Sequence, residues 1–216
     1  MSHGVYLGID CATPHMSLAL VEQDGRVLAR AAPDVGREHA ARIVGAIDGL
    51  LGDAGVTRRD VTAIAVGVGP GSYTGVRVAI ATAKGLARAL GVPLHGGSTL
   101  AAVAAARLAA GERGVAVLDA RRGNVYAALV ERAHALGESA HALVESAHAP
   151  AAGAGLERAP RVRVLDGPLK LATVDLPDRF PGERVLEGAP PDAAALAMTV
   201  VDRAGERPQA PEAVYL

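Results

Sequence analysis

Two hydrophobic periodicities follow each other in the first half of the chain, and their order limits the possible folds more than any other feature. Three short apolar runs, the last two separated by the turn signal Asp24-Gly25, predict three meandering strands. A helix period, a continuous apolar run, a glycine-rich stretch and another helix period come next. The expected strands cover residues 5–10, 16–21, 26–31, 61–68 and 92–95, and the expected helices cover 38–51, 76–90 and 98–110.

Strands and helices in this order predict an α/β fold. Three strands followed by helix, strand, helix, strand and helix match the ribonuclease-H-like half of the actin and sugar-kinase (ASKHA) architecture, a likeness that by itself carries no function. We therefore expect an actin-like fold of two lobes, with a ribonuclease-H-like N-terminal lobe over residues 1–110. Residues 111–216 would form a smaller, degenerate C-terminal lobe. The strands expected there cover 115–119, 124–130, 161–166 and 171–174, and a last helix covers 192–204.

An Ala- and His-rich insertion near residues 131–159 interrupts the expected C-terminal lobe. Ser-Ala-His-Ala occurs twice in it, and His134, His141 and His148 are spaced by seven residues. Seven residues of helix rise about 10 Å, which is too far for neighbouring histidines to share one ion as a pair four residues apart can. We therefore expect a lineage-specific insertion, partly helical or disordered, and no metal site.

The charge and composition of the chain argue against several classes of protein. The net charge is −1, and half of the 216 residues are apolar. A domain that grips RNA by itself usually carries a clear basic excess, so any RNA contact is expected to be made by a partner. Cys11 is the single cysteine, which excludes an intramolecular disulfide and agrees with a reducing compartment. No secretion signal and no apolar run of about 18 residues is visible, so we expect a cytoplasmic protein without a membrane segment.

The first candidate site lies where the first expected strand ends, at Asp10, Cys11 and Thr13. In the actin-like fold an aspartate at this point organises Mg²⁺ through water, and the small residues after it turn backbone amides toward phosphate. Alternatively, Asp10 caps the turn of a plain β-hairpin. The sequence leaves both interpretations open. Cys11 has no evident activating partner and is expected to be a small buried residue rather than a nucleophile.

The second candidate site is the glycine-rich stretch from Gly67 to Gly75, between a buried strand and a helix. Glycine permits a positive φ and close backbone approach, and Ser72 is placed to cap the following helix. Such a turn is a general anion site, although this one matches neither a Walker A loop, a dinucleotide fingerprint nor a nucleophile elbow. A tight turn that only seats the helix is at least as well supported. The candidate phosphate-binding residues are Asp10, Cys11, Thr13, Gly69, Gly71 and Ser72.

Rows of small residues mark one face of each of the first two helices. Glycine in a helix interior costs about 1 kcal/mol relative to alanine, so such a row needs a reason, and close packing with another helix is one. Packing of the two helices on their own sheet is the alternative. Arg77, Lys84 and Arg88 form a basic stripe on the second helix, expected to be a solvated face or an interface rim rather than an RNA contact. The rows are Ala41, Gly45, Asp48, Gly49 and Gly52 in the first helix, and Ala79, Ala83 and Ala87 in the second.

Four motifs of the chain resemble, in the same order, those of the TsaB (YeaZ) family. The most specific is GPGSYTGVRV at 69–78, which runs into AKGLA at 83–87. The others are IDCAT at 9–13, DARRGNVY at 119–126 and VYL at 214–216. The resemblance covers residues 5 to about 130 well and the rest loosely. Cys11, Tyr73 and Asn124 depart from the family, which often has a hydroxyl residue, a Phe and an acidic residue at these points.

The resemblance implies a non-catalytic scaffold and activator subunit in the threonylcarbamoyl modification of adenosine 37 in tRNA, with no cofactor of its own. Its partners would be the related catalytic subunit TsaD, a metalloprotein, and the ATPase TsaE. The tRNA would be contacted only indirectly, and the chain would form a homodimer in the absence of TsaD. In the family the first two helices form the interface, as a bundle of two plus two helices. The interface residues expected on this basis are Ala41, Gly45, Asp48, Gly49, Gly52, Arg77, Ala79, Ile80, Ala83, Lys84 and Ala87.

Two other functions stay open on the sequence. A small actin-fold phosphotransferase or ATPase would use Asp10 and the glycine turn, although the second half shows no clear glycine-rich adenosine motif. A peptidase is the other, because related chains have been classed with glycoproteases. No close pair of histidines and no nucleophile set is visible in the sequence, which makes the peptidase the less favoured of the two.

Overall fold

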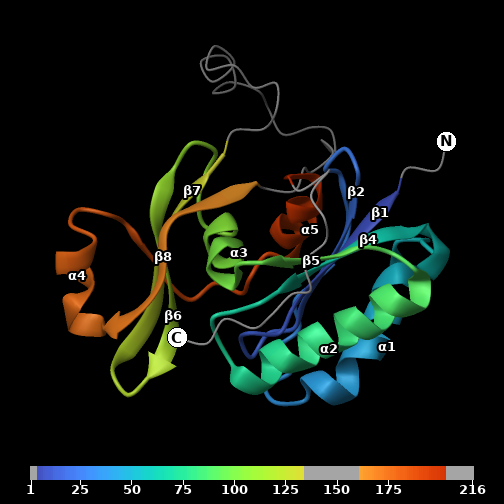
Figure 1. The fold of residues 1–216 in the computed structure, drawn as a ribbon, viewed down its shortest axis with the longest axis horizontal. Helices are drawn as coiled ribbons and strands as arrows, with labels where there is room; N and C mark the ends of the chain where they lie inside the picture. The colour runs from blue at the N-terminus through green and yellow to red at the C-terminus, as the bar shows by residue number, and fades with distance from the viewer. Residues whose placement is uncertain (1–3, 134–160, 203–216) are drawn as a thin grey trace, which may run out of the picture.

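Two β-sheets with helices between and around them make up the protein (Figure 1). The computed structural model describes residues 4–133 and 161–202, with the side chains of 199–202 excepted. The predicted insertion near 131–159 and the motif at 214–216 therefore lie largely or wholly outside the described residues. None of the described helices is long and apolar enough to cross a membrane.

The first sheet is formed by the strands predicted in the first half of the chain. Its order is β3-β2-β1-β4-β5. The strands β1 to β3 pair antiparallel, as a meander, while β1, β4 and β5 run parallel. Helical crossovers connect the parallel strands, as parallel pairing requires. The bounds are β1 Val5–Asp10, β2 Ser17–Glu22, β3 Val27–Ala31, β4 Val61–Gly67 and β5 Leu94–Gly97.

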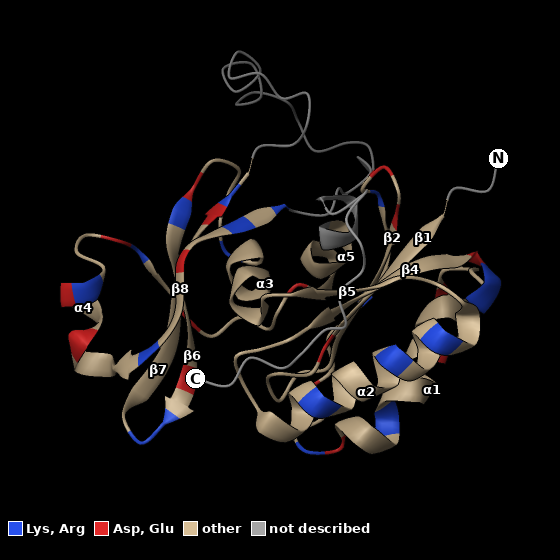
Figure 2. Ribbon diagram, in the orientation of Figure 1, with Lys and Arg blue, Asp and Glu red and all other residues tan. Residues whose placement is uncertain are grey.

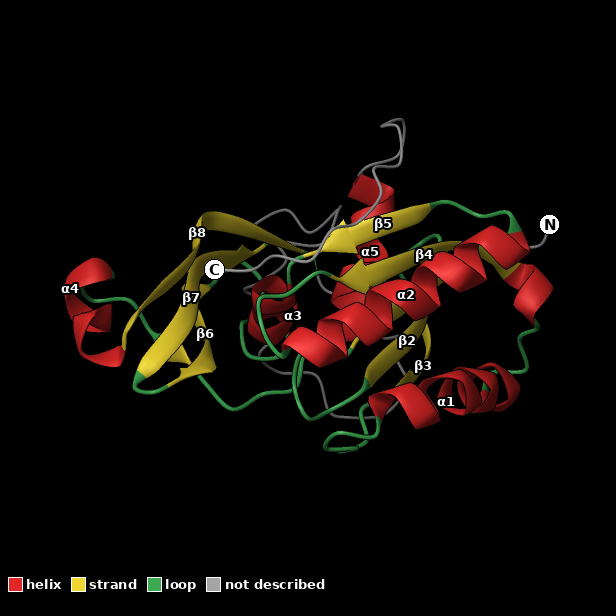
Figure 3. Ribbon diagram, turned by 60° about the horizontal axis from the view of Figure 1, so that its bottom comes forward, coloured by secondary structure: helices red, strands yellow, loops and turns green. Residues whose placement is uncertain are grey.

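Successive side chains of β1 point to opposite faces of the first sheet, and helices cover both faces. Leu7 and Ile9 pack into the core beneath α1 (His39–Asp53) and α2 (Tyr73–Leu90), which lie side by side on one face (Figure 3). The opposite face packs against α5 (Ala193–Asp202). There Gly8 permits close contact, since a Cβ at Gly8 would lie 2.0 Å from the carbonyl oxygen of Ala193.

The second sheet has the order β8-β7-β6-β9, and its first three strands pair antiparallel. The helix α3 packs its apolar residues on one face of this sheet, between the two sheets, while the short helix α4 packs on the other face (Figure 1). The bounds are α3 Thr99–Ala105, β6 Arg113–Arg121, β7 Asn124–Arg132, β8 Val162–Ala172, α4 Leu176–Arg179 and β9 Val185–Leu186. Short 3₁₀ turns cover Arg58–Asp60 and Thr173–Asp175.

Several boundaries differ from the sequence predictions. The strands expected at 161–166 and 171–174 are one strand, β8, because pairing with β7 continues on both sides of Gly167-Pro168. The helix α3 stops at Ala105 rather than near 110, and Ala109 N–H instead donates to the carboxylate of Glu112 at 2.9 Å. The last helix, expected in the C-terminal lobe, packs on the first sheet. The division of the chain into domains at residue 110 stays a prediction.

Candidate functional site

The Asp10 carboxylate, the centre of the predicted phosphate site, is fully buried and bound by the chain itself. Its Oδ1 accepts a hydrogen bond from Ala12 N–H at 2.8 Å, which is the turn-capping geometry of the second interpretation. Its Oδ2 accepts from the hydroxyl of Thr99 at 2.7 Å, and that hydroxyl oxygen in turn accepts from Gly69 N–H at 3.2 Å. Thr99 was missed by sequence reasoning because 89 residues separate it from Asp10.

Burial raises the pKa of two groups at the end of β1, the Asp10 carboxyl and the Cys11 thiol. Desolvation raises the pKa of Asp10 to about 6, against the smaller opposing effect of the two hydrogen bonds. Desolvation, with a contribution from the Asp10 charge, raises the pKa of the Cys11 thiol far above its usual range. The thiol therefore stays protonated at neutral pH, which argues against a nucleophilic role, as expected from the sequence.

The glycine-rich stretch closes tightly on the turn after β1. Ser72 N–H donates to the carbonyl oxygen of Ala12 at 2.7 Å, and the Ser72 hydroxyl accepts from Gly75 N–H at 3.3 Å as the predicted cap of α2. A Cβ at Gly75 would lie 1.9 Å from the Cys11 carbonyl oxygen, and one at Gly71 would lie 2.5 Å from that of Ala12. These contacts seat the helix on the turn. Binding of phosphate by these residues stays a prediction.

The residues of the predicted phosphate site are only partly brought together. Asp10 and Gly69 meet through Thr99, and Gly71 and Ser72 contact the turn that Asp10 caps. Thr13 makes a contact with a neighbour in sequence instead: its hydroxyl oxygen accepts a hydrogen bond from His15 N–H at 3.3 Å. Among the residues with described positions, no group of three His, Cys, Asp or Glu side chains is placed to hold a metal ion.

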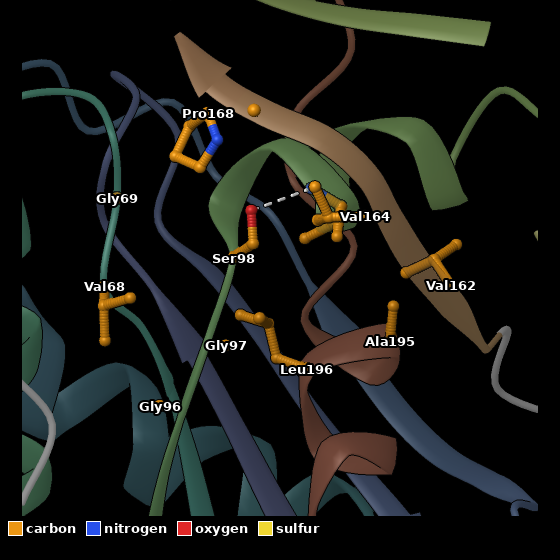
Figure 4. A pocket seen from close by; sticks show the side chains of 13 residues that line it. Val68, Gly69, Gly96, Gly97, Ser98, Val162, Val164, Pro168, Ala195 and Leu196 are labelled. Carbon is orange, nitrogen blue, oxygen red and sulfur yellow. Dashed lines mark hydrogen bonds between the residues drawn. The ribbon is translucent and has the colours of Figure 1, made fainter. Parts of the chain in front are cut away.

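A pocket of about 320 Å³ lies beside this turn, between the two sheets (Figure 4). Apolar side chains and glycines line it, and none of its lining residues is charged. The hydroxyl of Ser98, which caps α3 by accepting from Ala101 N–H at 3.3 Å, is the one polar side-chain group among them. Apart from the pair Gly96-Gly97, no local pattern in the sequence pointed to this pocket. Its walls are Val68, Gly69, Gly96 and Gly97 on one side, Val162, Val164, Gly167 and Pro168 on the other, and Ser98, Ala101, Ala102, Ala195 and Leu196 from α3 and α5.

The outer face of α1 and α2 exposes much of the predicted interface. On α1, all five predicted residues are exposed, and Asp48 forms a bidentate ion pair with Arg58 whose shortest distance is 2.6 Å. On α2, Arg77 and Lys84 are exposed, and the Arg77 guanidinium lies 4.6 Å from the centre of the Tyr73 ring. Basic residues follow one another along the ribbon of α2 (Figure 2). The five exposed residues of α1 are Ala41, Gly45, Asp48, Gly49 and Gly52.

Four predicted interface residues of α2 instead lie in the core of the chain. Ala79 and Ala83 are completely buried, and Ile80 and Ala87 keep less than a tenth of their surface exposed. They share the helix face of Val76, which packs on the first sheet and α1. For this row the alternative of packing within the chain is correct, because the apolar face of an amphipathic helix turns to its own sheet. Their assignment to a partner interface was wrong.

Comparison with known proteins identifies relatives of the chain. A family model described as TsaD, tRNA N6-adenosine threonylcarbamoyltransferase, matches residues 32–172. The tRNA threonylcarbamoyladenosine biosynthesis protein TsaB of Escherichia coli (strain K12) is 42% identical over 130 residues, which are 58% of this chain and 54% of that protein. The TsaB of Bacillus subtilis (strain 168) is 35% identical over 130 residues, or 60% and 56% of the two chains. The chain thus spans about half the length of the curated relatives it matches.

A solved structure matches the chain along its length. YeaZ from Pseudomonas aeruginosa has a TM-score of 0.72 and 28% identity with the chain, and the alignment covers 99% of this chain and 100% of that one. This match, with the two observed sheets, confirms the predicted α/β fold of the actin-like class. The sequence identities, the family model and the shared fold agree. The chain belongs to the TsaB (YeaZ) family, within the wider family that the TsaD model describes.

Proposed function

We propose that the chain is a non-catalytic subunit in the biosynthesis of threonylcarbamoyladenosine in tRNA, and that it binds a TsaD counterpart through the outer face of α1 and α2. The TsaB relatives carry the name of this pathway, which supports the assignment of the chain to the same process. The match to the TsaD family model supports an evolutionary relationship between the chain and the catalytic subunit. The closed hydrogen-bond network of Asp10 supports a role other than phosphoryl transfer, since both carboxylate oxygens are already bound by the chain.

The observation that carries this proposal is a set of helical glycines that the fold itself does not need. At Gly45, Gly49 and Gly52 of α1, and at Gly85 of α2, an added Cβ would meet no atom of the described residues within 4 Å. Each such glycine costs about 1 kcal/mol of helix stability relative to alanine. Because nothing in the part of the chain that the structure describes requires these glycines, we look for the reason outside it, and close approach of another helix is a physical reason of this kind.

Exposed apolar groups border this row of glycines. The side chains of Val44 on α1 and Tyr73 at the start of α2 are 53% and 57% exposed. Tyr73 and the Arg77 stacked on it are residue types that often anchor protein interfaces. We infer that they flank the contact, as two plus two helices. TsaE would join this complex and TsaD would hold the tRNA. Without TsaD, the same self-complementary face would pair two copies of the chain.

The substitution Gly49→Glu tests the interface. It places a long charged side chain on the row where close approach is needed, and a charge buried without a partner costs about 3 kcal/mol or more. We therefore expect association with the purified TsaD counterpart to weaken about 100-fold. Light scattering of the mixture, titrated over concentration, measures this change. Thermal unfolding of the free variant should remain close to the wild type, because position 49 is open to solvent.

Val174→Glu is the matched control. Val174 is 82% exposed and lies after β8, away from α1 and α2, so its substitution should leave the association unchanged. Ala83→Glu would not serve, since it would place a charge in the core and unfold the chain. Equal binding by wild type and Gly49→Glu would contradict the proposed interface. Failure of the wild type to bind TsaD, together with ATP hydrolysis lost in Asp10→Ala, would contradict the scaffold function itself.

A further inference from the structure

The turn between β6 and β7 holds two arginines in a backbone conformation that side chains rarely adopt. The φ angle is +66° at Arg121 and +55° at Arg122, and Gly123 follows at +75°. Of the non-glycine residues in the described ranges 4–133 and 161–202, only these two arginines have a positive φ. Glycine or asparagine is usual at such positions, because a Cβ there crowds the following carbonyl oxygen. The shape of the hairpin alone therefore gives no reason for arginine.

Hydrogen bonds from three sides hold this turn in place. Asp119 Oδ1 accepts from Arg121 N–H at 2.7 Å, and the side-chain amide of Asn124 donates to the carbonyl oxygens of both arginines at 3.3 and 3.2 Å. The carbonyl oxygen of Gly123 accepts from the N–H and the hydroxyl of Thr173 at 2.9 and 3.0 Å. Unfavourable backbone conformations persist where the surrounding structure enforces them in this way, and they concentrate at functional sites.

The positive charges of the turn are not neutralised by the fold. Arg121 and Arg122 are exposed, and among the described residues no carboxylate forms an ion pair with either guanidinium. Asp119 is the one acidic residue in the hairpin end at 117–126, and its Oδ1 is bound to the backbone of the turn. Other arginines around the second sheet do have carboxylate partners. These pairs are Arg113–Glu183, Arg163–Glu131, Arg179–Asp166 and Arg184–Glu112.

A third cation lies beside the turn on the neighbouring strand. Lys170 of β8 is exposed and is two residues, or about 7 Å, from Ala172, the strand partner of Asn124. Its ammonium nitrogen lies 6.0 Å from the centre of the Tyr126 ring. Figure 2 shows basic residues at the tip of the hairpin. The net charge of −1 for the whole chain therefore conceals a local group of exposed cations.

Phosphate groups are the ligands that fit this arrangement. The planar guanidinium of arginine binds a phosphate through two parallel hydrogen bonds, and exposed cations without partners lose no ion pair when a phosphate binds them. Adjacent cations on a rigid tip suit a chain of phosphates, as in a nucleic acid backbone. An acidic protein surface could also bind cations, but the substrate of the proposed process is itself a polyanion, a tRNA.

We propose that Arg121, Arg122 and Lys170 contact the phosphate backbone of the tRNA that a TsaD counterpart holds. The proposal rests on the function proposed above. Figure 1 shows the tip of the β6–β7 hairpin at the same, lower end of the molecule as the start of α2. There Tyr73 and Arg77 flank the proposed contact with TsaD. An RNA that extends from TsaD past this end of α2 would meet the turn.

The double substitution Arg121→Asn with Arg122→Asn tests the proposal in the assembled complex. Asparagine adopts a positive φ more readily than arginine, so the thermal midpoint of the free chain should rise by about 2 °C while two cations are lost. Anisotropy of a labelled, unmodified tRNA transcript, titrated with the complex of chain and TsaD between 50 and 200 mM salt, measures binding. We expect Kd at 100 mM salt to rise about tenfold and the slope of log Kd against log salt to fall by about 2.

Two further variants serve as controls. Arg121→Lys with Arg122→Lys keeps both charges and should restore most of the affinity and the salt slope. Arg107→Asn with Arg163→Asn removes the same charge at the other end of β7, and should leave tRNA binding unchanged. The positions follow from contacts there, since Arg163 pairs with Glu131, and the carbonyl oxygen of Leu108 accepts from Arg132.

The outcomes separate this proposal from the function on which it rests. If the Asn variant assembles with TsaD and binds tRNA with wild-type affinity and salt slope, the turn does not contact RNA, and the subunit function stands. Weaker association of the Asn variant with TsaD, measured by light scattering without RNA, would assign the turn to a protein contact and overturn the proposal as well. Failure of the wild type to assemble with TsaD would contradict the proposed function, and the RNA contact with it.

Discussion

Replacing Gly75 by alanine is expected to destabilise the protein by about 3 kcal/mol or more. The added Cβ would lie 1.9 Å from the carbonyl oxygen of Cys11, and a backbone oxygen does not move aside as the end of a flexible side chain does. To relieve the overlap, the N-terminus of α2 must lift from the turn after β1. The Ser72 cap and the hydrogen bond from Ser72 N–H to Ala12 would be strained together. Urea unfolding of the purified variant measures the loss.

Gly85→Ala on the same helix is the control with the opposite sign. Among the residues with described positions, no atom lies within 4 Å of the added Cβ there, so the substitution should stabilise the free chain by up to about 1 kcal/mol through helix propensity alone. The pair separates the cost of contact from the general effect of a methyl group in α2. Equal changes in unfolding free energy at the two positions would contradict the close contact between Gly75 and Cys11.

The free energy of unfolding is expected to fall by about 2 kcal/mol as pH rises from about 4 to about 6 because of Asp10 alone. Its pKa is raised from 3.8 to about 6 in the folded chain, so within this window the folded state holds a proton that the unfolded state has lost. Below the unfolded pKa both states are protonated, and the stabilising contribution is fully present. It is lost as pH approaches the folded pKa. A shift of about two pKa units corresponds to about 3 kcal/mol over the whole titration, of which about 2 kcal/mol is lost between pH 4 and pH 6.

Asp10→Asn isolates this contribution. The amide stays neutral at every pH, yet its oxygen still accepts from Ala12 N–H, so the turn is kept. The difference in unfolding free energy between wild type and variant should therefore decrease by about 2 kcal/mol from pH 4 to pH 6.5, since all other titrating groups cancel. Denaturant unfolding at four or five pH values measures it. A difference that stays constant with pH would show that the Asp10 carboxyl titrates as it does in water.

Local sequence patterns were sufficient to predict the elements of the first sheet and its helices. Period-two and period-3.6 apolar runs and the Ser72 cap reflect interactions within a few residues, which a sequence displays directly. The same holds for Gly91, whose left-handed conformation ends α2. The elements of the second half were harder. Two of them, α4 and β9, have four and two residues, too few for a periodicity to appear.

Features that depend on the packing of distant segments could not be predicted. The bond between Thr99 and Asp10 joins residues 89 apart, and the pocket forms only where β5, β8, α3 and α5 meet. On α2, the row of Ala79 and Ala83 was misread because small residues suit both an interface and a core. The charges of Lys84 and Arg88 on the opposite face were the signal that this row faces inward.

The return of α5 to the first sheet has a consequence for the order in which the protein is made. The sheet leaves the ribosome early, but the face formed by Tyr6, Val21 and Ala65 is covered by a helix that is synthesised about 130 residues after β4. Until then the nascent sheet exposes an apolar surface. The two halves of the chain therefore become stable together rather than in succession, and a truncated chain that lacks α5 would be a target for chaperones and proteases.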